Sequence, residues 1–139
     1  MPDYTVVTNE AAMAQANEAQ TGLALSFLRL FNGTLIPTGI TTKAEMVAAE
    51  TALIGYPVGG YPITAWSEPG LEAVGRAVIT SPLIGIVYAS GATAVIGGGW
   101  IEDAGGNVRA VFVFDPQRSL AALGDQIQFI RQLGFGNAQ

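Results

Sequence analysis

Residues 77–101 contain no charged side chain, and this apolar run limits the possible folds more than any other segment. Its length would suit a membrane-spanning helix. Pro82, Gly85, Gly91 and a glycine triplet at 97–99 interrupt it, however, and β-branched residues are common between them. Open strands and turns cannot satisfy their backbone hydrogen bonds in lipid. We therefore predict two strands of a β-rich domain and expect no membrane partner.

Short β patterns separated by turn residues recur along most of the chain, which is typical of a sandwich or barrel. The first runs from residue 22 to 31. Apolar residues occupy both its odd and its even positions, which indicates a strand covered on both faces. The other predicted strands span 63–66, 74–81, 84–89, 94–101, 107–114 and 126–131, and 119–123 is read as a helical turn. The fold class expected is mainly β (α+β), an antiparallel β-sandwich or partly open barrel.

One packed helix is predicted at about residues 42–54. Thr42 and Glu45 have the spacing of a capping box, in which each satisfies a free backbone N–H of the first turn. Gly55 stands where a helix usually ends. The apolar positions of the helical period are Met46, Val47, Leu53 and Ile54.

Residues 8–20 are rich in Ala, Glu, Gln and Asn, and Met13 is their one large apolar side chain. This composition favours a polar helix or an extended arm that reaches a neighbour rather than part of a core. The domain division expected is therefore an N-terminal arm at 1–21 and a single β-rich domain at 22–139. Neither an internal repeat nor a linker divides the second part.

Two glycine-rich segments have structural interpretations. The triplet at 97–99 predicts a β-bulge or a close approach of backbones where a Cβ would not fit. Residues 102–107, Glu-Asp-Ala-Gly-Gly-Asn, form the clearest hairpin loop, because Gly and Asn accept positive φ. Glu102 and Asp103 are accordingly interpreted as solvated turn residues.

Charged residues make up 12% of the chain, where ordinary domains have about 25%. A folded monomer of this size exposes roughly 6,800 Å², so its 6 basic and 11 acidic side chains leave wide uncharged areas. We infer that another protein covers part of this surface; the alternative is a monomer with a neutral Ala, Thr, Ser, Gln and Gly exterior. The net charge of -5 and the scattered basic residues argue against nucleic acid.

The chain has no Cys and no His, which excludes disulfides, thiolate or imidazole zinc sites and histidine-based nucleophile pairs. A carboxylate pair from Glu102, Asp103 and Asp115, or a calcium site in the same loop, would be the remaining options. Turn residues are the stronger interpretation. We expect no enzymatic activity, no catalytic residue, no cofactor and no metal.

Large aromatic side chains are the strongest candidates for interface anchors in such a surface. The residues selected are Trp66, Trp100, Tyr61, Phe112 and Phe135. The alternative is a small ligand- or carbohydrate-binding domain in which the tryptophans and tyrosines, Tyr56 and Tyr88 included, surround an aromatic cleft.

The order of turns and strands resembles that of small β-rich structural proteins of tailed bacteriophages. The resemblance covers about residues 25–130. Its elements are Leu-Phe-Asn-Gly at 30–33, a proline loop, the capped helix, a strand with Trp66, Gly-Gly-Gly-Trp-Ile-Glu-Asp-Ala-Gly-Gly-Asn-Val at 97–108, Phe-Asp-Pro at 114–116 and Gly-Asp-Gln-Ile-Gln-Phe at 124–129. It is a pattern of structure without an active-site motif, so no functional residue is carried over.

The resemblance implies a non-enzymatic virion protein. The first expectation is a capsid cement or decoration protein that forms a homo-oligomer, a trimer in particular, and clamps neighbouring major capsid subunits. The second is a tail or baseplate module. The first ten residues have neither the basic nor the apolar region of a signal peptide, so we expect synthesis in the host cytoplasm and a place in the virion.

Overall fold

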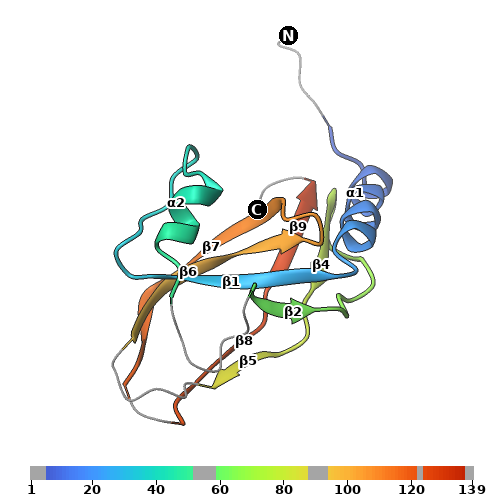
Figure 1. Ribbon diagram of the computed structural model, residues 1–139. Coiled ribbons are helices and arrows are strands. Elements are labelled where there is room, and N and C mark those ends of the chain that lie inside the picture. The colour runs from blue at the N-terminus through green and yellow to red at the C-terminus, as the bar shows by residue number, and fades with distance from the viewer. Residues whose placement is uncertain (1–5, 52–58, 88–93, 122–123, 137–139) are drawn as a thin grey trace.

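The computed structural model describes residues 6–51, 59–87, 94–121 and 124–136. Within these ranges the chain forms helices and strands in the order shown in Figure 1. They are α1 (Asn9–Gly22), β1 (Ser26–Asn32), α2 (Lys43–Ala48), β2 (Tyr61–Ile63), β3 (Gly70–Ala73), β4 (Arg76–Thr80), β5 (Ile84–Val87), β6 (Ala94–Asp103), β7 (Val108–Leu120), β8 (Gln126–Phe129) and β9 (Gln132–Gly136).

The strands form antiparallel sheets. A four-stranded sheet has the order β2-β1-β6-β7, a three-stranded sheet the order β3-β4-β9, and β5 pairs with β8. Figure 1 shows the four-stranded sheet across the middle of the molecule, with β4 and β9 crossing behind one end and β5 and β8 below. The predicted mainly β, antiparallel fold is confirmed, and the sheets do not close into a barrel.

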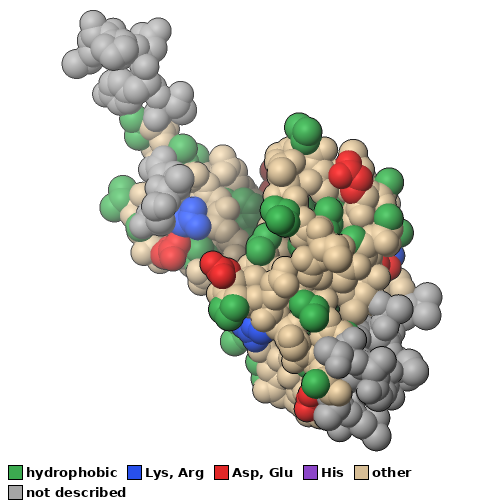
Figure 2. All heavy atoms as spheres, turned by 90° about the vertical axis from the view of Figure 1, so that its left-hand side faces the viewer, with side chains coloured by type: hydrophobic (Ala, Val, Ile, Leu, Met, Phe, Trp, Pro, Cys, Tyr) green, Lys and Arg blue, Asp and Glu red, His purple; other side chains and the backbone are tan. Residues whose placement is uncertain are grey.

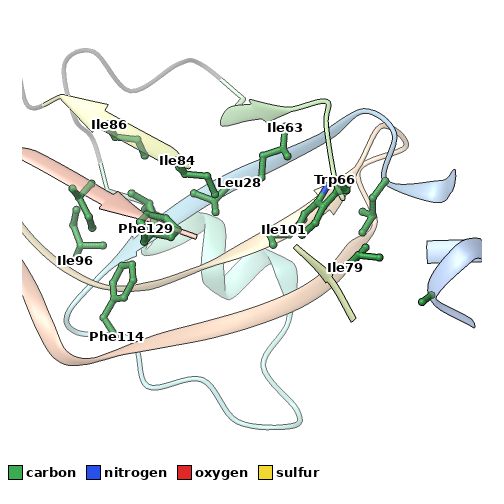
Figure 3. Close-up of a cluster of buried hydrophobic side chains, with 14 of the residues drawn as sticks. Leu28, Ile63, Trp66, Ile79, Ile84, Ile86, Ile96, Ile101, Phe114 and Phe129 are labelled. Carbon is green, nitrogen blue, oxygen red and sulfur yellow. The ribbon is translucent and has the colours of Figure 1, made fainter. Parts of the chain in front are cut away.

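The main core fills the space between these sheets. Figure 3 shows its side chains converging from different strands: Ile63 and Trp66 lie at one end, and Phe114 and Phe129 at the other. Leu28 of β1 lies between them and is fully buried. Non-directional burial of apolar surface therefore joins all three sheets into one body.

A second apolar cluster lies on the opposite face of the four-stranded sheet, beneath α2. It contains Phe31 of β1, Met46 of α2 and Trp100 of β6, all buried. Because successive side chains of a strand point to opposite faces, β1 supplies Leu28 and Leu30 to the main core and Phe31 to this cluster. The prediction that this strand is covered on both faces is confirmed.

The N-terminal segment is a packed helix and not an arm. Thr8 caps α1 by accepting a hydrogen bond from the Ala11 amide at 3.1 Å. Ala12 and Ala16, one turn apart, are fully buried and belong to the main core. Figure 1 shows α1 against β4, and β9 also contacts it. Of the two predicted alternatives the helix is confirmed and the extended arm is wrong, because Ala12 and Ala16, with Val7, Met13 and Leu23 beside them, seat this segment on the sheet.

The capped helix is real but shorter than predicted. Thr42 accepts a hydrogen bond from the Glu45 amide at 3.3 Å, as a capping residue should. α2 ends at Ala48, however, and Glu50 forms an isolated antiparallel bridge with Phe31. Val47, predicted to face inward, is exposed. The expected apolar positions Leu53 and Ile54 and the stop at Gly55 lie outside the described residues.

The glycine triplet forms both a bulge and a close approach, as predicted. The β6–β7 register shifts between Ile96 and Gly98. A Cβ on Gly98 would collide with the Phe112 carbonyl oxygen, and one on Gly99 with the Arg29 carbonyl oxygen. Both neighbouring backbones therefore approach β6 more closely than a side chain would allow.

Sequence patterns missed three features of the sheets. No strand is predicted at residues 70–73 or 132–136, where β3 and β9 form. Ser119 and Leu120, assigned to a helical turn, end β7, and the rest of that predicted turn includes residues that the structure does not describe. Edge strands such as β3 and β9 bury few side chains, so their alternation is weak.

We expect Gly99→Ala to destabilise the domain by about 1–3 kcal/mol, the usual range for inserting a carbon into a tightly packed core. The new methyl group would meet the Arg29 carbonyl oxygen and a ring carbon of Phe112. Urea unfolding followed by circular dichroism measures the loss. Gly85→Ala in β5 is the matched control, because its methyl group would meet only the Gln128 side chain at 3.8 Å or beyond. Equal stability of the two variants would contradict the close approach.

Candidate functional site

The two tryptophans predicted as interface anchors are core residues. Trp66 is 7% exposed and Trp100 is fully buried. The Trp66 indole N–H donates to the Ser26 hydroxyl at 3.0 Å, and the Trp100 indole N–H donates to Glu102 Oε2 at 3.1 Å. A tryptophan whose N–H finds an internal acceptor can be buried without losing a hydrogen bond. The interface prediction is therefore wrong for both.

The other three predicted residues, Tyr61, Phe112 and Phe135, are half-buried and pack against the main core. The structure does not bring the five together. Trp66 belongs to the main core and Trp100 to the cluster on the opposite sheet face. They therefore do not line one aromatic cleft. Tyr56 and Tyr88, the other tyrosines considered for such a cleft, lie outside the described residues.

Glu102 is the centre of a buried ion network rather than a solvated turn residue. It is 6% exposed. Lys43 Nζ lies 3.1 Å from its Oε2, and Arg29 Nη1 lies 3.5 Å from its Oε1. Arg29 also forms a two-point pair with Glu50, at 2.6 and 2.7 Å. Charges at this depth require partners, and here the partners come from β1, α2 and the segment after it.

The network joins elements that are distant in sequence. Arg29 lies over the Trp100 ring, 5.2 Å from its centroid. Lys43, the first residue of α2, also donates to the Gly106 carbonyl oxygen at 2.7 Å. These contacts fix α2 and the β6–β7 hairpin against the sheet. Both carboxylates are held by cations, so the arrangement is a structural clamp and offers no free acid or base.

Asp103 organises the hairpin loop. Its Oδ1 accepts hydrogen bonds from the Gly105 and Asn107 amides at 2.9 and 3.0 Å, and Arg109 Nε donates to Oδ2 at 2.8 Å. Gly106 has φ +81°, so the predicted hairpin is confirmed. Asp103 is only 7% exposed, which again contradicts a solvated turn residue. The hydrogen bond from Arg109, followed by that from the Asn107 backbone, lowers the pKa of Asp103 to about 2.

A small pocket of about 320 Å³ lies between the end of α1 and β2. Its wall includes the edge of Trp66, and Gln20 closes one side by donating to the Ser67 carbonyl oxygen at 3.1 Å. The lining residues are Gln20, Thr21, Ala24, Thr64 and Trp66. Because Trp66 is nearly covered, the pocket offers little aromatic surface on which a ligand could stack.

The outer face of the four-stranded sheet, the face toward α2, is covered over only part of its width. α2 and its cluster cover Phe31 and Trp100 and reach Val108 at the start of β7. Val95, Val111 and Val113 of β6 and β7 lie on the same face and are 39%, 43% and 56% exposed. We call these three side chains the valine face. Its residues escaped prediction because single valines in a strand pattern do not reveal which face is covered.

β7 also has an open edge. It is 13 residues long and, among the described strands, pairs only with β6. Its backbone groups on the other side are therefore available to another strand, as at any sheet edge. Figure 2 shows one side of the molecule, on which charged side chains are widely spaced between hydrophobic and uncharged ones.

Comparisons with protein-family models, curated proteins and solved structures find no match for this chain. No helix in the described part of the chain is long and apolar enough to cross a membrane. The same residues contain no group of three or more side chains suited to hold a metal ion.

We expect Glu102→Ala to lower the free energy of unfolding by roughly 3 kcal/mol, as is usual when one partner of a buried ion pair is removed. The substitution leaves the Trp100 N–H without its acceptor and removes a carboxylate from two cations. Urea unfolding measures the loss. Glu72→Ala is the control: its pair with Arg76 is half-exposed, so about 1 kcal/mol or less is expected. Losses of equal size would show that Glu102 is not a buried anchor.

Asp103 should make stability depend on acid pH. Its pKa in the folded chain, about 2, is below the ordinary 3.8, so its stabilising contribution is complete above about pH 4 and is lost as the pH falls toward 2. Urea midpoints from pH 5 to 2.5 should therefore converge for the wild-type chain and Asp103→Asn. Arg109→Gln, which removes the largest cause of the low pKa, should move this loss to higher pH. A wild-type advantage that stays constant down to pH 2.5 would refute the assignment.

Proposed function

We propose that this chain is a non-enzymatic structural protein of a tailed-bacteriophage virion. In this role it is a capsid cement protein that self-associates and stabilises contacts between major capsid subunits. The observation that carries the proposal is the valine face beside the open edge of β7 on a charge-poor surface. The resemblance in sequence pattern supports it independently, through the order of turns and strands.

The valine face is suited to a protein partner. A β-sheet face with only part of its width covered leaves apolar side chains in water, and such patches are typical of interaction sites. Val111 and Val113 alternate along β7 on the outer face, whereas Phe112 packs against the main core. A partner laid over this face would bury the valines without disturbing the core.

The edge of β7 adds hydrogen bonds to this apolar contact. Strand addition to a sheet edge gives affinity through the backbone, and alternate side chains give specificity. A long open edge normally invites association and is blunted by charge or proline. In β7, Pro116 and Arg118 lie in its second half, and the valines lie in the first, where the one charged residue, Arg109, is paired with Asp103.

The pocket at Trp66 is weak support for a ligand-binding function. The valine face is stronger support for a protein partner. The tryptophan of the pocket is nearly covered, and the indole N–H is already bonded to Ser26. A ligand there would have to be small, and the pocket wall combines polar groups of Gln20 and Thr64 with apolar surface of Ala24 and Trp66.

We expect the wild-type chain to elute as an oligomer, with a trimer at three times the chain mass of 14.4 kDa. Size exclusion with light scattering at two protein concentrations measures this mass. Val111→Asp with Val113→Asp should release the monomer, because two carboxylates would have to be desolvated at the contact. Circular dichroism checks that the variant folds.

Val74→Asp is the matched control. Val74 is 83% exposed between β3 and β4, away from the valine face, so this variant should associate like the wild type. A wild-type monomer at both concentrations, or a double variant that associates unchanged, would refute the proposed surface. If the wild-type chain associates and the double variant does not, antibody labelling of purified virions distinguishes a position in the head from one in the tail or baseplate.

A further inference from the structure

The loop between β1 and α2 displays two isoleucines to water. Ile36 is 81% exposed and Ile40 is 88% exposed. At the upper right of Figure 2, this loop and α2 form a projecting lobe that carries several hydrophobic side chains and few charged ones. We call residues 33–48 the α2 lobe. Its first nine residues include no charged side chain, so the isoleucines stand in an uncharged surface.

The loop is held in a defined shape at its base and at its tip. At the base, Gln117 of β7 donates to the Gly33 carbonyl oxygen at 2.9 Å, and Leu35 packs against the cluster under α2. At the tip, the Thr41 amide donates to the Thr38 carbonyl oxygen at 3.1 Å, and the Thr38 amide donates to the Thr41 hydroxyl at 2.8 Å. Both isoleucines are therefore presented on a preformed loop.

Neither isoleucine is required by the loop that carries it. Turn tips are usually Gly, Asn, Asp or Ser, because these residues accept the turn dihedrals or bond the backbone with their side chains. Ile40 follows Gly39 at the tip, and its side chain can make no such bond. Leu35 already supplies the apolar contact of this segment with the cluster under α2. A residue that breaks a local rule without an internal gain is typical of a functional surface.

The α2 lobe suits a protein surface better than a membrane. Segments that lie on a membrane combine apolar residues with aromatic and basic ones. None of residues 33–48 is aromatic, and Lys43, their one basic residue, is held by Glu102 at 3.1 Å. Aliphatic side chains on a preformed loop can enter an apolar hollow of a protein with little loss of conformational entropy.

A second copy of this chain is a poor match for these side chains. Its pocket at Trp66 has polar residues, Gln20, Thr21 and Thr64, as three of its five lining residues. An isoleucine inserted there would cover polar groups that lose water without gaining a partner, which is unfavourable. The copy–copy contact proposed above uses the valine face and the edge of β7, and it does not include Ile36 or Ile40.

We propose that the α2 lobe attaches this chain to a different protein, and that Ile36 and Ile40 enter an apolar hollow of that protein. The inference rests on the proposed function, in which that protein is a major capsid subunit. It assigns the two contacts of a cement protein to two surfaces. The valine face and the edge of β7 join one copy to the next, and the α2 lobe joins the copies to the capsid.

Ile36→Ser combined with Ile40→Ser tests the lobe. Both side chains lie outside the core, so the double variant should unfold at the same urea concentration and form the same oligomer as the wild type. Capsids stripped of this chain are titrated with labelled protein, and pelleting measures the bound fraction. We expect the double variant to bind about a hundredfold or more weakly, because each isoleucine contributes roughly tenfold when it leaves water.

Val74→Ser is the matched control, because Val74 is 83% exposed between β3 and β4 and lies outside the lobe; it should bind capsids like the wild type. A double variant that binds equally well would overturn this inference and leave the proposed function standing. A double variant that no longer self-associates would also overturn it, since the lobe would then belong to the copy–copy contact.

Two further outcomes concern the partner itself. A wild-type chain that does not bind the stripped capsids would overturn both this inference and the proposed function. Binding of the wild type to phosphatidylcholine vesicles, lost in the double variant, would assign the lobe to a membrane and overturn the protein partner.

Discussion

The absence of side chains at the centre of β6 is the constraint on which the rest of the structure depends. β6 is the inner strand between β1 and β7, and its glycines leave space on both faces. The Phe31 ring occupies the place of a Gly98 side chain, and the Phe112 ring that of a Gly99 side chain. One ring belongs to the cluster under α2, and the other packs against the main core. The two apolar clusters therefore lie back to back across one thin strand, and the position of α2 depends on it.

The few charges of the chain are concentrated where this packing needs orientation. Apolar contacts hold α2 on the sheet but do not fix its direction, whereas the Arg29, Glu50, Glu102 and Lys43 contacts are directional. Burying these groups costs desolvation, which each pair offsets only through good geometry. Two of the six cations, Arg29 and Lys43, are used in this way, and Arg76 and Arg109 pair with carboxylates nearer the surface, so the exterior keeps few unpaired cations. A charge-poor surface is thus partly a consequence of how the interior is built.

Local signals in the sequence were sufficient for the capped helix, the glycine-rich hairpin and the bulge, because each depends on residues close together in the chain. The burial of Glu102 was not predictable from its loop, since its partners Arg29 and Lys43 come from distant segments. The packing of α1 was missed because its inward face consists of alanines, which carry no strong apolar period. Trp100 has the same residue type as an interface anchor, and only the acceptor at Glu102 makes it a core residue. Sequence alone therefore predicted the strands better than it predicted which sides of them face outward.

The two kinds of contact proposed for β7 solve different parts of one problem. An apolar face such as that of Val111 and Val113 supplies attraction but little orientation, and a strand added to an open edge can shift in steps of two residues without changing which side chains face the sheet. Charges fix the register because a shifted partner leaves desolvated ions without counterparts. Arg118 in the second half of β7 lies over the Phe114 ring, at the end of the strand away from Val111 and Val113. Attraction without direction would permit aggregates of mixed geometry, whereas a charge at one end of the edge limits the registers that a partner strand can adopt.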